Sequence, residues 1–446
     1  MPSAVSPSRA AAFDILLRVE QTGAYASELL HSERLEKLST ADRALTTELV
    51  MGVLRWRSRL DETITAASSR PLNNVDAEVL SGLRLAAYQM QFLSRIPARA
   101  AINESVELVK RAKKRSAAPF ANAVLRRLAE IKPEPLPETI IGDPIPFLTR
   151  EFAHPEWLVK RWVTAFGLER ASAVCKHDQR IPSTAIRLDT AEIERELASE
   201  GVELAPGALL ASARIVIGGD VTRTRAFREG RVFIQDEASQ LVAALVGTGS
   251  RLLDCCAAPG GKTAALAARN PTAEIVAAEL HPHRAELLRK RVQAANGQVI
   301  AADALYLPLQ GGFDRVLADV PCSGTGTLAR NPEIKWRLVP DDLSDLHARQ
   351  VDILRVALRQ LAPGGRAVYS TCSLEHEENE DVVEEALPGN AAYELRDCRK
   401  ELQRLRDDGE LVWGDLESLL SGKFLRTLPG VQPGDGFFAA VVESRC

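Results

Sequence analysis

The sequence predicts a protein of three parts: an all-α bundle, a small α+β linker domain and an α/β domain with a Rossmann-like, parallel, doubly wound sheet. Apolar residues recur at helical spacing through the first 132 residues, without the period-two alternation of half-buried strands. Five prolines then fall between residues 131 and 147, where a helix cannot continue. After Gln235, short apolar stretches alternate with helical ones, which is typical of parallel strands joined by crossover helices.

The composition agrees with a globular protein. The 446 residues are 46% hydrophobic and 26% charged. No apolar run reaches the ~20 residues that cross a bilayer, and Asp14 interrupts the apolar stretch near the start, so we expect no membrane span and no signal peptide. The seven cysteines show neither a disulfide framework nor Cys-x-x-Cys metal ligands. We therefore expect a cytoplasmic protein that holds no metal, and we expect a monomer.

The all-α part is expected over residues 1–142, with helices such as 9–20 and 41–60 and a turn at 70–74. The proline-rich stretch 131–147 should run extended and separate this part from the next. Residues 143–229 form the linker domain, for which the pattern predicts helices at 155–166 and 190–200 and strands at 184–188 and 213–217, with another strand at 231–234.

The α/β domain is expected over residues 230–446. Its predicted strands are residues 251–254, 274–279, 298–303, 314–319 and 366–370, separated by helical stretches such as 284–295 and 343–361. In such a sheet the ligand site lies at the carboxyl ends of the strands.

A glycine-containing loop, CCAAPGGKT, follows the first predicted strand of this sheet. A phosphate-binding P-loop is a poor fit, because Cys256 stands where its leading glycine is required, although Gly261 and Lys262 fit its second half. The dinucleotide pattern Gly-x-Gly-x-x-Gly is missing as well. Glu279 and Asp303 end the next two predicted strands, so an adenosine-type ligand is the better interpretation. The alternative is that both acids are solvated loop residues.

Two cysteines follow the last two predicted strands. Cys322 lies in DVPCSGTG, which begins at Asp319, and Cys372 lies in YSTCS. A free cysteine is more often a small buried apolar residue than a nucleophile. Here each cysteine follows a strand among Ser, Thr and Gly, and both loops should open onto the crevice that the glycine loop faces. Both are therefore candidate functional residues.

These segments resemble the signatures of the RNA 5-methylcytosine methyltransferases. The similarity extends to NPEIKW at residues 331–336, ENE at 378–380 and DGFF at 435–438. Residues 9–30 and 42–63 are similar to the NusB-type antitermination fold. The two together resemble the ribosomal RNA small subunit methyltransferase B family, which acts on one cytosine of 16S rRNA. The resemblance implies a NusB-like bundle and a class I methyltransferase domain.

The resemblance also implies roles for individual residues. Cys372 is implied to be the nucleophile that adds to carbon-6 of cytosine, and Cys322 to assist breakdown of the adduct. Asp319 is implied to hold the cytosine edge near ring nitrogen 3, or else to face the cofactor. Lys262 is a neighbouring cation that would favour a thiolate.

The implied cofactor is S-adenosylmethionine. Its methionine end would be wrapped by the glycine loop, its ribose held by Glu279 and its adenine by Asp303. Glu279 departs from the family, which usually has Asp there, so we expect binding to be retained with a shifted loop. The loop residues implied in binding are Cys256, Ala257, Ala258, Pro259, Gly260, Gly261 and Lys262. We expect Cys255, just before them, to be structural.

The implied partner is small-subunit rRNA. The all-α part carries a basic run that we expect to contact phosphate, although a charge run is usually only a solvated face. Its members are Lys110, Arg111, Lys113, Lys114 and Arg115. Two alternatives remain open: the same chemistry on tRNA, and a non-catalytic RNA-binding assembly or antitermination factor.

Overall fold

The computed structural model describes residues 5–32, 35, 37–131, 142–188, 190–292, 297–387, 389 and 392–445. The chain divides into two compact units. Unit 1 is Met1–Ile181 with Leu328–Arg337, and unit 2 is Pro182–Thr327 with Leu338–Cys446. Within the described ranges, no helix is long and apolar enough to cross a membrane.

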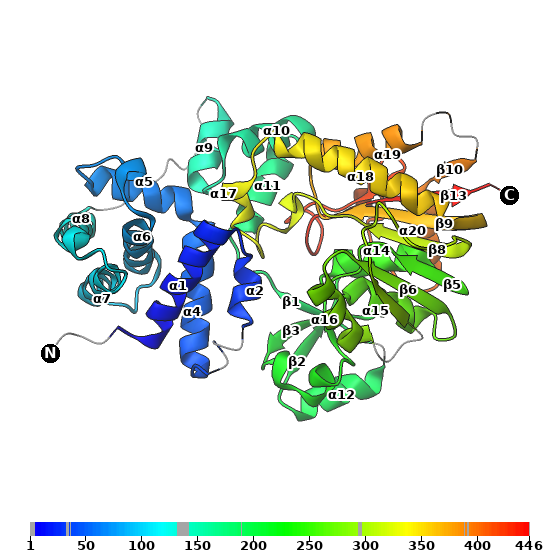
Figure 1. The fold of residues 1–446 in the computed structure, drawn as a ribbon, viewed down its shortest axis with the longest axis horizontal. Helices are drawn as coiled ribbons and strands as arrows, with labels where there is room; N and C mark the ends of the chain where they lie inside the picture. The colour runs from blue at the N-terminus through cyan, green and yellow to red at the C-terminus, as the bar shows by residue number, and fades with distance from the viewer. Residues whose placement is uncertain are drawn as a thin grey trace. The chain divides into compact units, whose positions relative to one another are not determined.

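Unit 1 is helical, as predicted for its residues up to 142 (Figure 1, blue to teal-green, with α17 in yellow). Its core is a continuous apolar cluster that includes Phe13, Leu49, Leu83 and Leu125. Its elements are α1 Pro7–Thr22, α2 Ala26–Leu30, α4 Thr40–Arg55, α5 Arg57–Ala67, η1 Leu72–Asn74, α6 Ala77–Phe92, α7 Ala98–Arg111, η2 Arg115–Ala117, α8 Ala118–Glu130, α9 Pro144–Glu151, α10 Glu156–Phe166, α11 Leu168–Asp178 and α17 Ile334–Arg337.

The prediction that residues 131–147 run extended is wrong at its end. Residues 132–141 lie outside the described residues, but α9 begins at Pro144. Proline is tolerated in the first turn of a helix, where its missing N–H would have no partner. The Asp143 side chain accepts a hydrogen bond from the backbone N–H of Ile145 at 3.0 Å and caps this turn.

The segment Leu328–Arg337 is packed within unit 1 by hydrogen bonds to backbone groups. Nζ of Lys335 donates to the carbonyl oxygens of Arg55 and Ala153, both at 2.9 Å. Nε1 of Trp336 donates to the carbonyl of Leu54 at 2.6 Å. Lys335 is 1% exposed, and its burial lowers its pKa from 10.5 to about 7. A lysine of the NPEIKW motif is therefore an interior residue of the helical unit.

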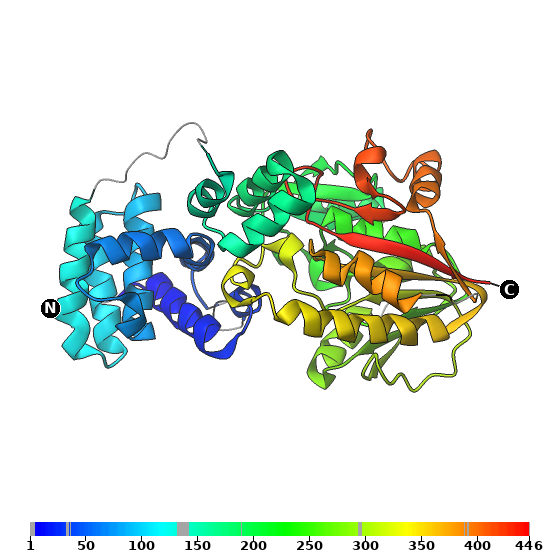
Figure 2. The same ribbon diagram turned by 90° about the horizontal axis from the view of Figure 1, so that it is seen from above.

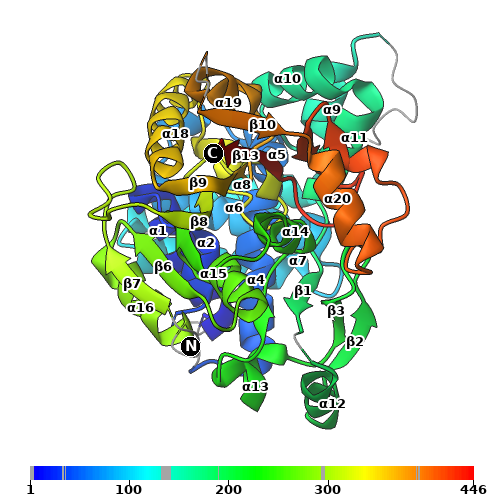
Figure 3. The ribbon, with the colours of Figure 1, turned by 90° about the vertical axis from the view of Figure 1, so that its right-hand side faces the viewer.

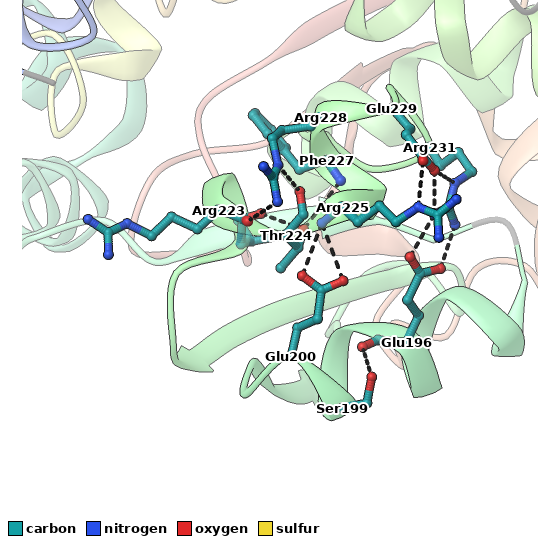
Figure 4. A network of polar contacts seen from close by, with 11 residues as sticks. Glu196, Ser199, Glu200, Arg223, Thr224, Arg225, Phe227, Arg228, Glu229 and Arg231 are labelled. Atoms are coloured by element: carbon teal, nitrogen blue, oxygen red, sulfur yellow. Dashed lines mark hydrogen bonds and ion pairs between the residues drawn. The ribbon is translucent and has the colours of Figure 1, made fainter.

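Unit 2 begins with a small antiparallel sheet in the order β2-β3-β1-β4. Its strands are β1 Thr184–Arg187, β2 Glu203–Pro206, β3 Ala213–Gly218 and β4 Phe233–Ile234, and its helical segments are α12 Ala191–Ser199, η3 Val221–Arg223 and α13 Arg225–Arg228. Arg231 pairs with both Glu196 of α12 and Glu229 at 2.7–2.8 Å, and the Glu200 carboxylate accepts from the backbone N–H of Arg225 (Figure 4). This network ties α12 to α13 on one face of the sheet.

In the described residues, nine strands form the large mixed sheet in the order β11-β12-β13-β9-β8-β5-β6-β7, with β10 beside β13. The strands β5 to β9 are parallel, as predicted, whereas β13 runs antiparallel to β9. Their bounds are β5 Arg251–Asp254, β6 Glu274–Glu279, β7 Gly297–Ala301, β8 Phe313–Asp319, β9 Leu361–Thr371, β10 Tyr393–Arg396, β11 Leu420–Ser421, β12 Phe424–Arg426 and β13 Phe438–Ser444.

Helices cover both faces of this sheet. Successive residues of a strand point to opposite faces, so each strand contributes apolar side chains to two separate clusters. Leu252, Leu317 and Val368 belong to one apolar cluster with α14, whereas Leu253 and Val316 belong to another with α18 (Figures 2 and 3). The helical segments are α14 Glu237–Val246, α15 Gly261–Arg269, α16 Pro282–Val292, η4 Thr325–Thr327, α18 Asp342–Arg359, η5 His376–Glu378, α19 Glu380–Ala386, α20 Cys398–Asp407 and η6 Glu417–Leu419.

Candidate active site

The two cysteine loops meet at one edge of the large sheet. The strands β8 and β9 are parallel neighbours, with Asp319 beside Ser370 at their ends, so the loops that follow leave the sheet together. Sγ of Cys322 lies 3.3 Å from Sγ of Cys372, and the backbone N–H of Cys372 donates to Sγ of Cys322 at 3.3 Å. The structure therefore brings the two cysteine loops into contact with each other.

The environment of Cys322 favours its protonated form. Its hydrogen bond to Cys372, its burial and the negative charges of Cys372 and Glu378 together raise the pKa of the Cys322 thiol well above its ordinary value.

Asp319 is held from two sides at the end of β8. Its Oδ2 accepts from Nζ of Lys262 at 2.8 Å, and its Oδ1 accepts from Oγ of Ser370 at 2.7 Å. Nζ of Lys262 also lies 4.8 Å from the centre of the Phe437 ring. Burial alone would lower the pKa of Lys262, but the attraction of Asp319, and then of Cys372, raises it. Lys262 is thus a fixed cation beside the cysteines.

The glycine loop joins β5 to α15. Gly260 precedes the helix with φ +106°, a left-handed conformation that a side chain would disfavour. Asp254, the last residue of β5, is buried and accepts from Oγ1 of Thr263 at 2.7 Å. Burial raises the pKa of Asp254 to about 7, against the opposing effect of the Thr263 hydrogen bond. The loop is therefore anchored at both of its ends.

The two acids expected to face an adenosine-type ligand follow β6 and β7, which continue the parallel order from β5. Glu279 ends β6, and its Oε1 accepts from the backbone N–H of His281 at 2.9 Å. Asp303 lies two residues beyond β7, which ends at Ala301, so the prediction that it ends the strand is wrong. The carboxylates and the left-handed glycine turn lie after strands that end at one sheet edge, which suits ribose hydroxyls and an adenine amino group.

The basic run lies at the end of α7 and the start of η2. Lys110 pairs with Glu107 at 2.6 Å, and Lys114 pairs with Asp76 at 3.0 Å and Glu78 at 3.7 Å. Among the residues that the structure describes, the other three members have no acidic partner: Arg111, Lys113 and Arg115. A hollow of about 420 Å³ is lined by Val5, Glu107, Lys110, Arg111 and Arg115.

Two buried charged residues, Glu378 and Lys335, were not singled out by the sequence as functional residues. Glu378 is 0% exposed and accepts hydrogen bonds from both cysteine loops. Lys335 is buried in unit 1. Glu378 stands among other acids and Lys335 follows an apolar residue, and neither setting distinguishes a buried charge from a solvated one.

The chain is similar to three family models. The model of the 16S rRNA methyltransferase RsmB/F matches residues 245–443, the NusB family model residues 6–130, and the model of the ferredoxin-like domain of RsmF/B-like methyltransferases residues 154–216.

Curated relatives match along most of the chain. The probable ribosomal RNA small subunit methyltransferase B of Bacillus subtilis is 37% identical over 388 residues, which are 83% of this chain and 86% of the relative. The ribosomal RNA small subunit methyltransferase B of Vibrio cholerae is 32% identical over 451 residues, which are 98% and 97% of the two chains. The crystal structure of PH0851 has the same fold over all of both chains, with a TM-score of 0.82 at 22% identity.

Proposed function

The chain belongs to the 16S rRNA methyltransferase RsmB/F family, and from that membership we propose that it methylates carbon-5 of a cytosine in 16S rRNA through a covalent adduct with Cys372. The observation that carries this proposal is the pair of thiols, 3.3 Å apart, at the ends of adjacent parallel strands. Lys262 and Asp319 supply a cation and a carboxylate beside them.

A cysteine nucleophile answers the difficulty of the reaction. Carbon-5 of cytosine is too poor a nucleophile to take a methyl group directly. A thiolate of Cys372 that adds to carbon-6 breaks the conjugation of the ring and loads electron density onto carbon-5. The covalent adduct thus divides one hard step into easier ones. Lys262 would favour the thiolate, because a neighbouring positive charge stabilises the anion.

We assign Cys322 to breakdown of the adduct after methylation. Because its surroundings raise the pKa of its thiol, Cys322 competes poorly with Cys372 for attack on carbon-6. Its sulfur lies next to that of Cys372. Once Cys322 has given up its own proton to solvent, its thiolate would take the proton from carbon-5, and the double bond between carbon-5 and carbon-6 would re-form as the bond to Cys372 breaks.

Asp319 would hold the cytosine edge near ring nitrogen 3. Its carboxylate is oriented by Lys262 and Ser370, so it is preorganised to stabilise the form of the ring that thiolate attack creates. A role towards the cofactor is the alternative for Asp319.

The cofactor would be S-adenosylmethionine, which supplies the electrophilic methyl group when bound. The loop from Cys256 to Lys262 would wrap its methionine end, Glu279 would hold the ribose and Asp303 the adenine. The carboxylates and the close-approach turn at Gly260 fit such a ligand. Glu279 carries its carboxylate one methylene further out than the usual Asp.

We further propose a division of labour along the chain, with residues 1–142 binding RNA, 143–229 linking, and 230–446 transferring the methyl group. The basic run would contact phosphates through Arg111, Lys113 and Arg115, which are not held by acids. A target cytosine must leave its stack or lie in a loop to reach the cysteines.

The test uses labelled S-adenosylmethionine with protein-free small-subunit rRNA and with bulk tRNA, both from cells that lack the enzyme. Label recovered as 5-methylcytidine in rRNA is the expected result. Label in tRNA alone would keep the chemistry and overturn the substrate. Label in neither RNA, together with tight RNA binding, would favour the non-catalytic assembly factor.

Two variants test the assignment of the cysteines. Cys372→Ala should abolish turnover and leave RNA affinity unchanged, and continued methylation by this variant would overturn Cys372 as the nucleophile. Cys322→Ala should form the adduct but release it slowly, so a protein–RNA complex that survives denaturing electrophoresis should accumulate. The same complex at wild-type levels would contradict the role of Cys322.

A further inference from the structure

We propose that Glu378 is a positioning residue whose carboxylate ties the loop of Cys322 to the loop of Cys372 and so fixes the separation of the two sulfur atoms. The catalytic meaning of that separation rests on the proposed function. The tie itself rests only on hydrogen bonds within unit 2.

The carboxylate of Glu378 accepts hydrogen bonds from the residue that follows each cysteine. Its Oε1 accepts from the backbone N–H of Ser323 at 2.8 Å. Its Oε2 accepts from the hydroxyl groups of both Ser323 and Ser373. Ser323 directly follows Cys322, and Ser373 directly follows Cys372. One buried carboxylate therefore binds the residue next to each of the two cysteines.

Other contacts hold Glu378 in this place. Nε2 of Gln350, on α18, donates to Oε1 of Glu378 at 2.9 Å. The hydroxyl of Tyr369, on β9, donates to the backbone carbonyl of Glu378 at 2.6 Å. Gln350 and Tyr369 are 0% exposed. The acid is thus held by a helix and by a central strand of the sheet as well as by the loops that it joins.

The loops are also joined directly. Oγ of Ser323 lies 3.0 Å from Oγ of Ser373, and the backbone N–H of Leu374 donates to Oγ1 of Thr325 at 2.9 Å. The close approach of the two serine oxygens depends on the carboxylate, because both hydroxyl groups donate to the same oxygen, Oε2 of Glu378. Loss of the carboxylate would leave both hydroxyl groups buried with fewer acceptors.

Each side-chain and backbone donor that faces the Glu378 carboxylate donates to it, and a carboxylate accepts through both oxygens. A glutamine of the same size would place an NH₂ group at one of the two oxygen positions. It would remove or reverse the hydrogen bonds there and take away the negative charge. Glu378 is also one of the negative charges near Cys322, whereas the cation Lys262 interacts with Cys372. Opposite charges therefore flank the two sulfurs, in keeping with a thiol at Cys322 and a nucleophile at Cys372.

The test compares the full chain with Glu378→Gln and with a matched control, Glu380→Gln. The Glu380 carboxylate is also buried and lies two residues away, but it pairs with Arg426 at 2.6 Å. Each protein is treated with diamide, which takes up the two thiol hydrogens to become a hydrazine as the Cys322–Cys372 disulfide forms. Peptide mass spectrometry measures the rate of that disulfide.

We expect the disulfide to form about tenfold or more slowly in Glu378→Gln than in the wild type, because the sulfurs are no longer held together. Glu380→Gln should keep the wild-type rate. On rRNA, kcat of Glu378→Gln should fall by roughly 10²-fold while KM for RNA stays unchanged, since a misplacement of about 1 Å has that effect.

Disulfide formation at the wild-type rate in Glu378→Gln would overturn the proposal, whatever happens to methylation. A slowed disulfide in a protein whose wild type methylates no RNA would support the positioning role and refute the proposed function. If Glu378→Gln does not fold, Ser323→Ala and Ser373→Ala take its place, because each removes a hydroxyl bond to the carboxylate. Wild-type disulfide rates in both would overturn the proposal.

Discussion

Lys262 and Asp319 form a close ion pair, with Nζ of the lysine 2.8 Å from Oδ2 of the aspartate. The lysine comes from the start of α15 and the aspartate from the end of β8, so the pair joins the glycine loop to the first cysteine loop. Both side chains are largely shielded from water, at 12% and 26% exposure. The loop expected to hold the cofactor and the residue expected to hold the cytosine are thus joined by one ion pair.

Lys262→Met should destabilise the protein by about 3 kcal/mol, because it leaves the Asp319 carboxylate largely buried without its cation. The double variant Lys262→Met with Asp319→Asn should recover part of this loss, since the unpaired charge is gone. Urea unfolding of the four proteins of this cycle measures the coupling. Lys262→Met, Asp319→Asn and the double variant should all lose methylation. Changes in the free energy of unfolding that simply add in the double variant would show that the two residues are not coupled.

Gly326→Ala should damage the site through its backbone. A Cβ at Gly326 would lie 2.2 Å from the carbonyl oxygen of Gly436 and 2.9 Å from that of Cys372, so these backbones must move apart. Such overpacking costs about 1–3 kcal/mol, and we expect methylation to fall together with the melting temperature. Gly414→Ala is the control, because a Cβ there meets nothing within 4 Å. Equal effects in the two variants would refute this explanation.

Lys335→Met should change how stability depends on pH. The pKa of Lys335 is about 7 in the folded protein against 10.5 ordinarily, so between these values the unfolded chain holds a proton that the folded chain lacks. The wild type should therefore gain stability relative to the variant as pH rises from about 7 to 10, by up to about 1.4 kcal/mol per pH unit. Urea unfolding at pH 7, 8 and 9 measures this difference, and parallel curves would contradict it.

Arg111→Ala and Arg115→Ala should each weaken RNA binding and its dependence on salt. Each phosphate contact that is lost should lower the slope of log K against log salt by about 0.7–0.9. Lys114→Ala is the matched control, because Lys114 is held by Asp76 and Glu78 and the hydrogen bond to Asp76 raises its pKa. Fluorescence anisotropy over a salt series measures all three, and equal slopes would place the RNA elsewhere.

The sequence predicted the parts of the fold that depend on local pattern. The strand 251–254 and the strand 274–279 match β5 and β6 residue for residue, because each is a short apolar run between loop signals. The antiparallel strands β10 to β13 were not predicted. Their partners are distant in the chain: Phe438 pairs with Thr371 in the register of β13 on β9. Such pairing leaves no local signal.

The candidate site was predicted less completely than the fold. The sequence indicated that Cys322 and Cys372 leave one edge of the sheet, and the sulfurs are in contact. It gave no sign that Glu378 joins the two loops, because a glutamate followed by more acids is typical of a solvated surface. Burial of a charge is decided by tertiary partners, here Ser323 and Gln350, and not by neighbours in sequence.

The inclusion of Leu328–Arg337 in unit 1 limits how this protein can be divided. A chain shortened to begin at residue 182 would keep this segment but lose the carbonyl groups of Leu54, Arg55 and Ala153 that accept from Lys335 and Trp336. A lysine and an indole ring would then enter water on a loop that begins six residues after Cys322. The helical part therefore cannot be removed without cost, because it supplies the hydrogen-bond acceptors of Leu328–Arg337, a segment that lies in sequence between two parts of unit 2.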